Sequence, residues 1–140
     1  MDPPRARLCA TCAGPPCYSF LNKLKVLVRN QTRDTVLGDA VDVADTSSKR
    51  RVGLLKHERL DRGQGLWITP CESVHTFFMR FPIDLVYLDK HLKVKKIRHA
   101  VPAWRMSMCL MARSIIELPA GTAAETGTQA GDQLVCQELP

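Results

Sequence analysis

The longest strongly apolar stretch of the chain, from His75 to Asp89, carries charged residues and a proline inside it. Apolar runs of this length that are rich in aromatic and β-branched residues are typical of buried strands. Pro82 cannot donate a hydrogen bond to a central ladder, so we expect the run to break there into two elements. Asp84 follows directly after the break, where a carboxylate between aliphatic neighbours needs a charged partner or the amide of a turn.

Short alternating or β-branched segments predict further strands on both sides of that stretch. They lie at residues 24–28, 35–37, 41–44, 65–68, 92–97, 114–118 and 133–138. Clusters of Gly, Pro, Asn and Asp separate them and are typical of tight turns. The pattern therefore predicts a mostly β domain of the α+β type, either a compact β-sandwich or a barrel-like arrangement of short strands.

One clear helix signal lies between residues 46 and 57. Asp45 or Thr46 can cap the free amides at the start of a helix. Val52 and Leu55 are three residues apart and would face the core. A single helical turn is also expected after Thr122, before Gly127.

The composition fits one domain with a real core, because the chain has 140 residues of which 45% are hydrophobic. Twenty Lys and Arg against fourteen Asp and Glu give a net charge of +6, which favours solubility and loose attraction to polyanions. No segment reaches the length of a transmembrane helix. Arg5 and Arg7 are not followed by the apolar region of a signal peptide, so we expect a cytoplasmic protein, and nothing favours an oligomer over a monomer.

Residues 1–22 look like a separate flexible leader, and residues 23–140 like a single β-rich domain. The leader contains two Pro-Pro pairs, which disfavour regular structure. Cys9, Cys12 and Cys17 raise the question of a zinc site, but no fourth ligand lies at finger spacing. We expect no metal there, and we expect the six cysteines to stay reduced in the cytoplasm.

Several short motifs follow one another in a fixed order along the chain. They are Arg51-x-Gly53-Leu54-Leu55, Gly65-Leu66, Phe78-Met79, Pro82-Ile83-Asp84, Asp89, Glu117-Leu118-Pro119-Ala120-Gly121 and Gly131-Asp132. In order and spacing they resemble domain-of-unknown-function family 192, over about Leu24 to Glu138. The resemblance implies a compact β-sandwich or barrel-like fold with a short helix, and it implies no activity.

Three charged residues are expected close to the core: Arg51 on the helix, and Asp84 and Glu117 in strands. An unpaired buried charge costs on the order of several kcal/mol, so Arg51 is predicted to pair with Glu117 or, failing that, with Asp84. The pair could simply fix the helix to the sheet. It could also form the polar floor of a pocket, where Arg51 would hold a carboxylate or phosphate. The ligand-binding candidates are Arg51, His75, Met79, Asp84, Trp104 and Glu117.

Two alternatives involve chemistry. In a hydrolase, His75 could act as a general base with Asp84 or Glu117 as its orienting partner, and Cys71 or Cys109 as a nucleophile, although no nucleophile motif is present. A soft-metal site, of the kind that selects copper(I), could use the sulfur-rich segment and neighbouring residues. Its candidates are Met106, Met108, Cys109, Met111, Cys71, His75 and Met79. Filling gaps in the core is the favoured use of this segment, so we expect no metal and no cofactor.

A basic ribbon, from Lys93 to His99, raises the question of nucleic acid. Aromatic residues make up only 6% of the chain and do not alternate with this ribbon, as a stacking platform requires. Lysines that protect a solvated strand edge are the favoured interpretation. The sequence thus favours an accessory domain that binds a small ligand or a protein without catalysis.

Overall fold

The computed structural model describes residues 25–139. Their elements are β1 (Val26–Asn30), β2 (Thr35–Ala44), α1 (Ser47–Val52), β3 (Gln64–Ile68), β4 (Ser73–His75), β5 (Ile83–Leu88), β6 (Val94–Val101), β7 (Met106–Met108), β8 (Ser114–Pro119), α2 (Thr122–Glu125) and β9 (Leu134–Glu138). The mostly β prediction is confirmed. Of the two elements expected around Pro82, only the second forms, as β5; the first half of the run is a loop, because β4 ends at His75 and residues 76–82 form no strand. The strand β7 was not predicted.

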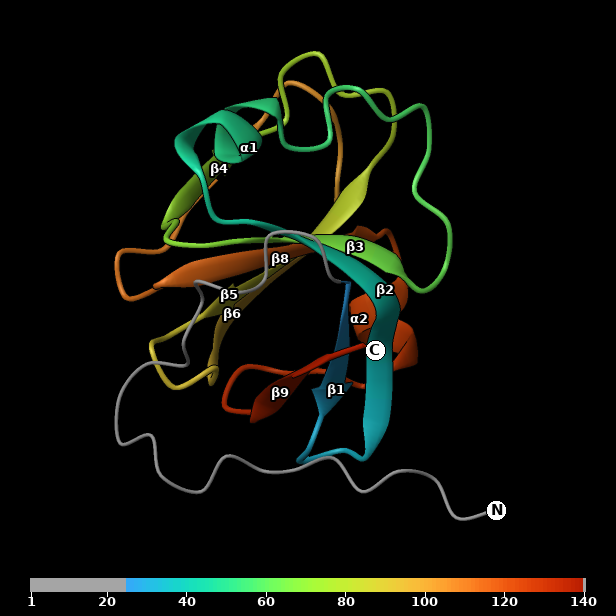
Figure 1. The fold of residues 1–140 in the computed structure, drawn as a ribbon, viewed down its shortest axis with the longest axis vertical. Coiled ribbons are helices and arrows are strands. Elements are labelled where there is room, and N and C mark those ends of the chain that lie inside the picture. The colour runs from blue at the N-terminus through green and yellow to red at the C-terminus, as the bar shows by residue number, and fades with distance from the viewer. Residues whose placement is uncertain (1–24, 140) are drawn as a thin grey trace.

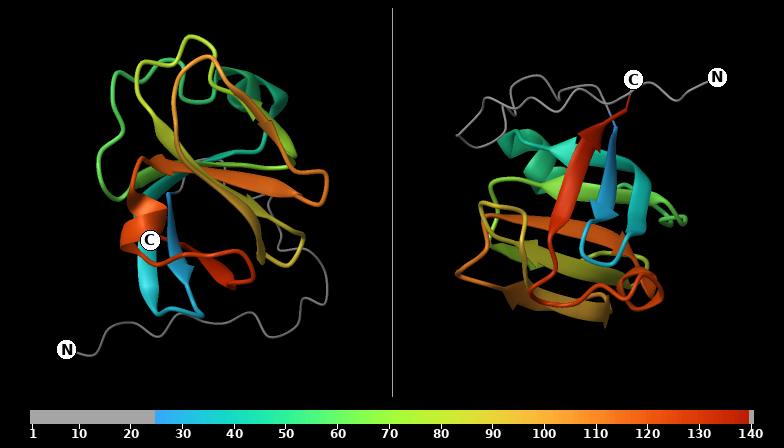
Figure 2. Two further views of the ribbon diagram at one scale, coloured as in Figure 1. Left: turned by 180° about the vertical axis from the view of Figure 1, so that it is seen from behind. Right: turned by 90° about the horizontal axis from the view of Figure 1, so that it is seen from below.

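Seven strands form one sheet in the order β6-β5-β8-β3-β2-β1-β9, and β4 pairs with β7 in a second, two-stranded sheet (Figure 1). All pairs are antiparallel except β2 with β3. The large sheet curls into a half-barrel, as the views of Figure 2 show. Its two edges meet at one bridge, between Lys93 and Gln133. The basic segment does lie on an edge strand, β6, as its edge-protecting interpretation requires.

Strand alternation divides the core between the two faces of the sheet. In β8, Ile116 and Leu118 belong to a cluster on one face, and Ile115 belongs to a cluster on the other. Every residue of β5 and β8 is buried, because both faces of these central strands are covered. The second cluster includes Leu54, Ile68 and Met79, and it lies on the side of α1.

The helix α1 is shorter than its sequence predicts. Thr46 caps it by accepting a hydrogen bond from the amide of Lys49, and the chain leaves the helix at Gly53, whose φ of 49° is unfavourable for other residues. No residue of α1 is buried, so the prediction that Val52 faces the core is wrong. Leu54, just beyond the helix, makes the buried contact instead, and Leu55 packs partly against the same cluster.

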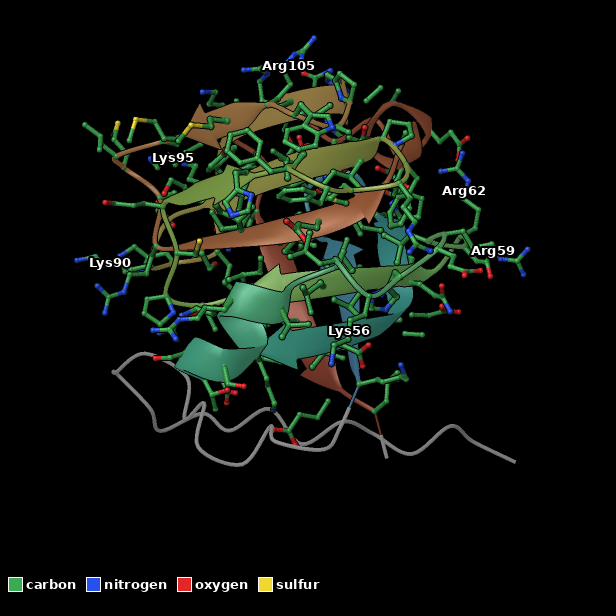
Figure 3. The ribbon with its side chains drawn as sticks, turned by 90° about the horizontal axis from the view of Figure 1, so that it is seen from above. Lys56, Arg59, Arg62, Lys90, Lys95 and Arg105 are labelled. Atoms are coloured by element: carbon green, nitrogen blue, oxygen red, sulfur yellow. The ribbon has the colours of Figure 1, made fainter. Side chains whose placement is uncertain are left out.

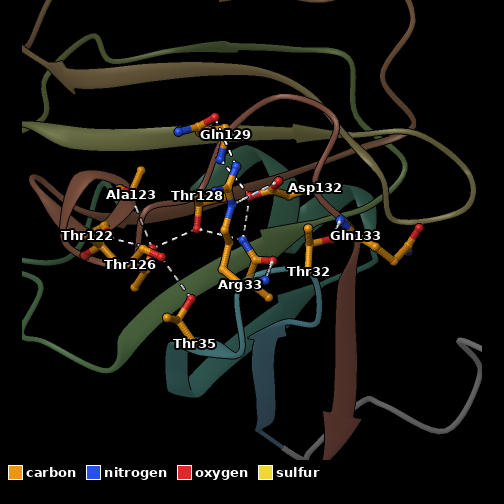
Figure 4. Close-up of polar contacts among 11 residues, drawn as sticks. Thr32, Arg33, Thr35, Thr122, Ala123, Thr126, Thr128, Gln129, Asp132 and Gln133 are labelled. Atoms are coloured by element: carbon orange, nitrogen blue, oxygen red, sulfur yellow. Dashed lines mark hydrogen bonds and ion pairs between the residues drawn. The ribbon is translucent and has the colours of Figure 1, made fainter.

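A polar network joins the segment around the β1–β2 turn to the loop before β9 (Figure 4). Asn30 donates to the side chains of Asp132 and Thr128, and Arg33 donates to Asp132 and Gln129. Burial alone would raise the pKa of Asp132, but hydrogen bonds from Asn30, the Gln129 amide and Arg33 lower it. The network therefore holds the β1–β2 turn against the loop before β9.

The predicted leader, with Cys9, Cys12 and Cys17, lies outside residues 25–139. Within that range, no helix is long and apolar enough to cross a membrane.

Candidate functional site

A pocket of about 500 Å³ lies between α1, the loop that follows it, the end of β3 and strand β4. Figure 1 shows α1 beside β4, above one end of the large sheet. Four of the six ligand-binding candidates line the pocket: Arg51, His75, Met79 and Glu117. Apolar side chains, among them Leu54, Ile68 and Val74, form much of the remaining wall. The Gly53-Leu54-Leu55 motif is a signal for Leu54, whereas no motif in the sequence points to Ile68 or Val74.

Glu117 is the one acidic residue of the pocket wall in the described part of the chain. Alternation along β8 places its side chain on the same face as Ile115, toward the second core cluster. The residue is only 4% exposed, and Oε2 has no hydrogen-bond partner among residues 25–139. Burial raises the pKa of this carboxyl to about 7. Near neutral pH the group is therefore partly protonated and can either accept or donate a hydrogen bond.

The predicted ion pair between Arg51 and Glu117 is wrong. Arg51 is exposed at the rim, and no salt bridge joins it to Glu117 or Asp84 in the part of the chain that the structure describes. Its neighbour Arg50 is half-buried and donates to the carbonyl oxygen of Asp45, at 2.9 Å. The ion pair does not form because α1 ends at Val52. Beyond that end the chain turns the side chain of Leu54, and not that of Arg51, toward the sheet.

Asp84 lies on the other face of the sheet. In β5 it shares a face with Val86 and Leu88, whereas its neighbour Leu85 shares the face of Glu117. Its two oxygens accept hydrogen bonds from the backbone amides of Ala100 and Ala123, at 2.8 and 2.9 Å. The amide alternative for this carboxylate is thus confirmed, and Asp84 joins β6 and α2 without entering the pocket.

His75 lies at the exposed rim, where it stacks on Phe77 with ring centroids 5.0 Å apart. It shares the pocket with Glu117 and not with Asp84, and no hydrogen bond joins His75 to Glu117 within the described range. Burial raises the pKa of the Cys71 thiol, which donates to the carbonyl oxygen of Ser73. Cys71 therefore stays protonated near neutral pH and is a poor nucleophile.

Within the sulfur-rich segment only Cys109 packs against the core, and the prediction that the methionines fill it is wrong. Met106, Met108 and Met111 are exposed on the surface, and Ser107 is the residue of β7 that points inward. Trp104 is exposed beside them and does not line the pocket. Among the described residues, no group of three His, Cys, Asp or Glu side chains could hold a metal ion.

The fold and the site define a small, mostly β domain whose curled sheet carries a pocket walled by one short helix. The chain belongs to domain-of-unknown-function family 192, whose model, described as an uncharacterized ACR family, matches residues 27–136. It is 32% identical over 111 residues to a UPF0127 protein of Thermococcus sibiricus, covering 75% of this chain and 71% of that one. It is 30% identical over 114 residues to a UPF0127 protein of Pyrococcus horikoshii, covering 77% and 96%.

Two solved structures share the fold. One is a protein of unknown function from Novosphingobium aromaticivorans, with a TM-score of 0.68, 19% identity, and coverage of 79% of this chain and 82% of that one. The other, from Sinorhizobium meliloti, is described as a candidate transcription regulator, with a TM-score of 0.70, 18% identity, and coverage of 79% and 91%. At these identities the likeness concerns the fold alone.

Proposed function

We propose that this domain is a small cytoplasmic accessory domain that binds a small polar ligand in the pocket beside α1. The observation behind the proposal is the carboxyl group of Glu117, which is buried at the pocket wall with one oxygen unpartnered among the described residues. A buried polar atom without a hydrogen bond is costly to maintain, and such atoms occur at binding sites where a ligand supplies the missing partner.

The lining residues indicate what kind of ligand would fit. Its inner end needs a hydrogen-bond donor, either a hydroxyl or an amino group, to meet Glu117 Oε2. Its body should be apolar, because Leu54, Ile68 and Val74 line the space between. The volume of about 500 Å³ falls within the usual range for small-molecule sites.

Binding requires nothing beyond this pocket. A hydrolase that uses His75 would also need a nucleophile within hydrogen-bond reach, and the Cys71 thiol is protonated and bonded to Ser73. We therefore favour binding over catalysis.

Three probes with the same apolar body test the proposal: benzylamine, benzyl alcohol and benzoate. We expect saturation-transfer NMR at about pH 8, where Glu117 is mostly ionised, to detect the amine most strongly, then the alcohol, and to detect benzoate weakly. In the Glu117→Gln variant, which keeps the shape of the side chain, the amine should lose its advantage over the alcohol. Equal signals from all three probes in both proteins would show that Glu117 does not contact a ligand, and the proposal would fail.

A further inference from the structure

Six large apolar side chains are exposed along β7 and the loops near its two ends. They are Phe78, Trp104, Met106, Met108, Leu110 and Met111, with exposures of 70, 56, 74, 54, 74 and 70%. All six come from β7 or from the loops that follow β4 and flank β7, and β4 and β7 pair in the small sheet. We call these six residues the apolar face. Elsewhere in the described part of the chain, Val36 is the one exposed large apolar residue. A gathering of this size on a small domain is typical of an interaction surface.

The two aromatic residues of the apolar face adopt costly backbone conformations. Phe78 and Trp104 have φ angles of 64° and 65°, in the left-handed region that bulky residues rarely adopt. Their rings meet edge to face with centroids 4.6 Å apart. Strained residues of this kind cluster at functional sites, where the surrounding structure fixes them.

Thr76 is the residue that fixes the two aromatic loops to each other. Its backbone oxygen accepts from the amides of Met79 and Trp104, and its hydroxyl accepts from the amide of Arg105 and donates to the carbonyl oxygen of Pro102. The aromatic rings are therefore exposed by a rigid local structure, and a partner would meet them already in place.

The segment that carries the apolar face is rich in basic residues. The segment 71–113 contains eight Lys and Arg and three Asp and Glu, whereas the rest of the chain contains twelve and eleven. One of the three acids, Asp84, is buried against backbone amides, so it does not offset the surface charge. Lys96 donates to the carbonyl oxygen of Met108, and Arg105 donates to that of Trp104. Figure 3 labels Lys95 and Arg105 among the basic side chains at the surface.

We infer that the apolar face binds the surface of an anionic lipid membrane. Trp, Phe, Leu and Met side chains can enter the boundary between head groups and acyl chains, while neighbouring Lys and Arg are attracted to anionic lipids. The charge favours this occupant over a protein. Lys96 and Arg105 contact residues of the apolar face and form no salt bridge among the described residues, and an anionic membrane supplies the opposite charge without a matched sequence. The inference does not depend on the pocket beside α1. That pocket has His75 in its wall, near the apolar face, but it opens next to the helix.

The two tryptophans allow a direct test with the full chain. Trp67 is 2% exposed and Trp104 is 56% exposed, so a change in emission on binding reports Trp104. With vesicles of equimolar phosphatidylglycerol and phosphatidylcholine, we expect a blue shift and co-sedimentation, both weakened by added salt. With phosphatidylcholine alone we expect neither. The Trp104→Phe variant should co-sediment without a blue shift.

Two matched variants distinguish binding through the apolar face from non-specific hydrophobic adsorption to vesicles. Replacing Leu110 and Met111 by Ser together should lower binding by at least about tenfold, because two exposed apolar side chains are lost. Val36→Ser removes an exposed apolar residue elsewhere and should leave binding unchanged. Circular dichroism checks that both variants are folded.

Three results would overturn the inference. One is the absence of binding to anionic vesicles. Another is undiminished binding of the Leu110 and Met111 double variant. The third is a chain that elutes as a dimer and ignores vesicles, while the double variant elutes as a monomer; the apolar face would then be an interface between two copies.

Discussion

Glu117 has a carboxyl group buried in a central strand without a positive partner among the described residues. Alternation along a central strand buries it, and no salt bridge among residues 25–139 includes it. Since burial raises the pKa of its carboxyl from 4.5 to about 7, the folded state holds a proton that the unfolded state releases. The group therefore links folding to pH and makes the pocket wall sensitive to it.

We predict that Glu117 makes the stability of the domain depend on pH. Below about pH 4.5 the carboxyl is protonated in both states and does not make stability depend on pH. As pH rises from about 4.5 to about 7 the unfolded chain loses this proton while the folded chain keeps it, so stability falls, and the loss is complete once pH has passed the folded pKa of about 7. The contribution amounts to about 3 kcal/mol between these limits. We expect urea unfolding of the Glu117→Gln variant to show that much less loss of stability between about pH 4.5 and pH 8 than the parent chain. Parallel stability curves for the two proteins would mean that Glu117 is hydrated.

The sequence predicts the position of Glu117 but not its lack of a partner. Strand alternation between branched aliphatics is a local property, and it predicted burial of Glu117 and Asp84 alike. Whether Arg51 reaches either of them depends on the residue at which α1 ends, which Gly53 decides by leaving the helix one turn early. The amides that satisfy Asp84 come from two distant elements, and no local pattern shows them.

At the scale of elements, the edge strand β6 and the helix α2 are both tied to the central strand β5 through Asp84. The bonded amide of Ala100 lies in β6 at a left-handed residue, with φ 45°, where the ladder is irregular. The bonded amide of Ala123 lies in the first turn of α2. One carboxylate thus satisfies two amides that the regular ladders leave without partners.

We predict that Asp84→Ala destabilises the domain by about 3 kcal/mol, because it leaves two backbone amides unsatisfied. Asp42→Ala is the control, since it removes an exposed ion pair with Lys25 and should cost about 1 kcal/mol or less. Equilibrium unfolding measures both. Equal costs for the two variants would show that water replaces Asp84 at these amides.

The strand β7 shows where element prediction fails for a physical reason. Its three residues belong to a small second sheet, whose pairing partner β4 lies more than thirty residues away in the sequence. Only one side of β7 meets the core, and Ser107 faces that side. The methionines consequently face solvent, although their hydrophobicity alone predicts burial.

For the whole molecule, the decisive feature is the closure of the curled sheet near its chain ends. The Lys93–Gln133 bridge joins residues 40 positions apart in the sequence, and the Asn30–Asp132 hydrogen bond joins residues 102 positions apart. Such contacts cannot be read from local patterns, and the sequence accordingly left open whether the domain is a sandwich or barrel-like. All the strands described lie between Val26 and Glu138, which is also close to the span of the family match.

From this we predict that a chain starting at Lys23 unfolds at the same temperature as the full chain. Residues 1–22 have few large apolar residues to contribute to a core. Differential scanning calorimetry measures the midpoint. A fall of more than about 5 °C would show that these residues stabilise the domain, because a loss of 1 kcal/mol shifts the midpoint by about that much.

The most direct test of the proposed function is an amide NMR titration of the full chain with benzylamine at about pH 8. The pocket predicts progressive shifts confined to its wall, at Val52 to Leu55, at Ser73 to His75 and at Glu117, with a dissociation constant of about 1 mM or tighter. A second, smaller pocket of about 330 Å³ between β2 and α2, lined by Asp39, Arg62 and Glu125, is the internal comparison. Shifts at that second pocket, or no shifts at all, would contradict the proposal that the pocket beside α1 is the binding site.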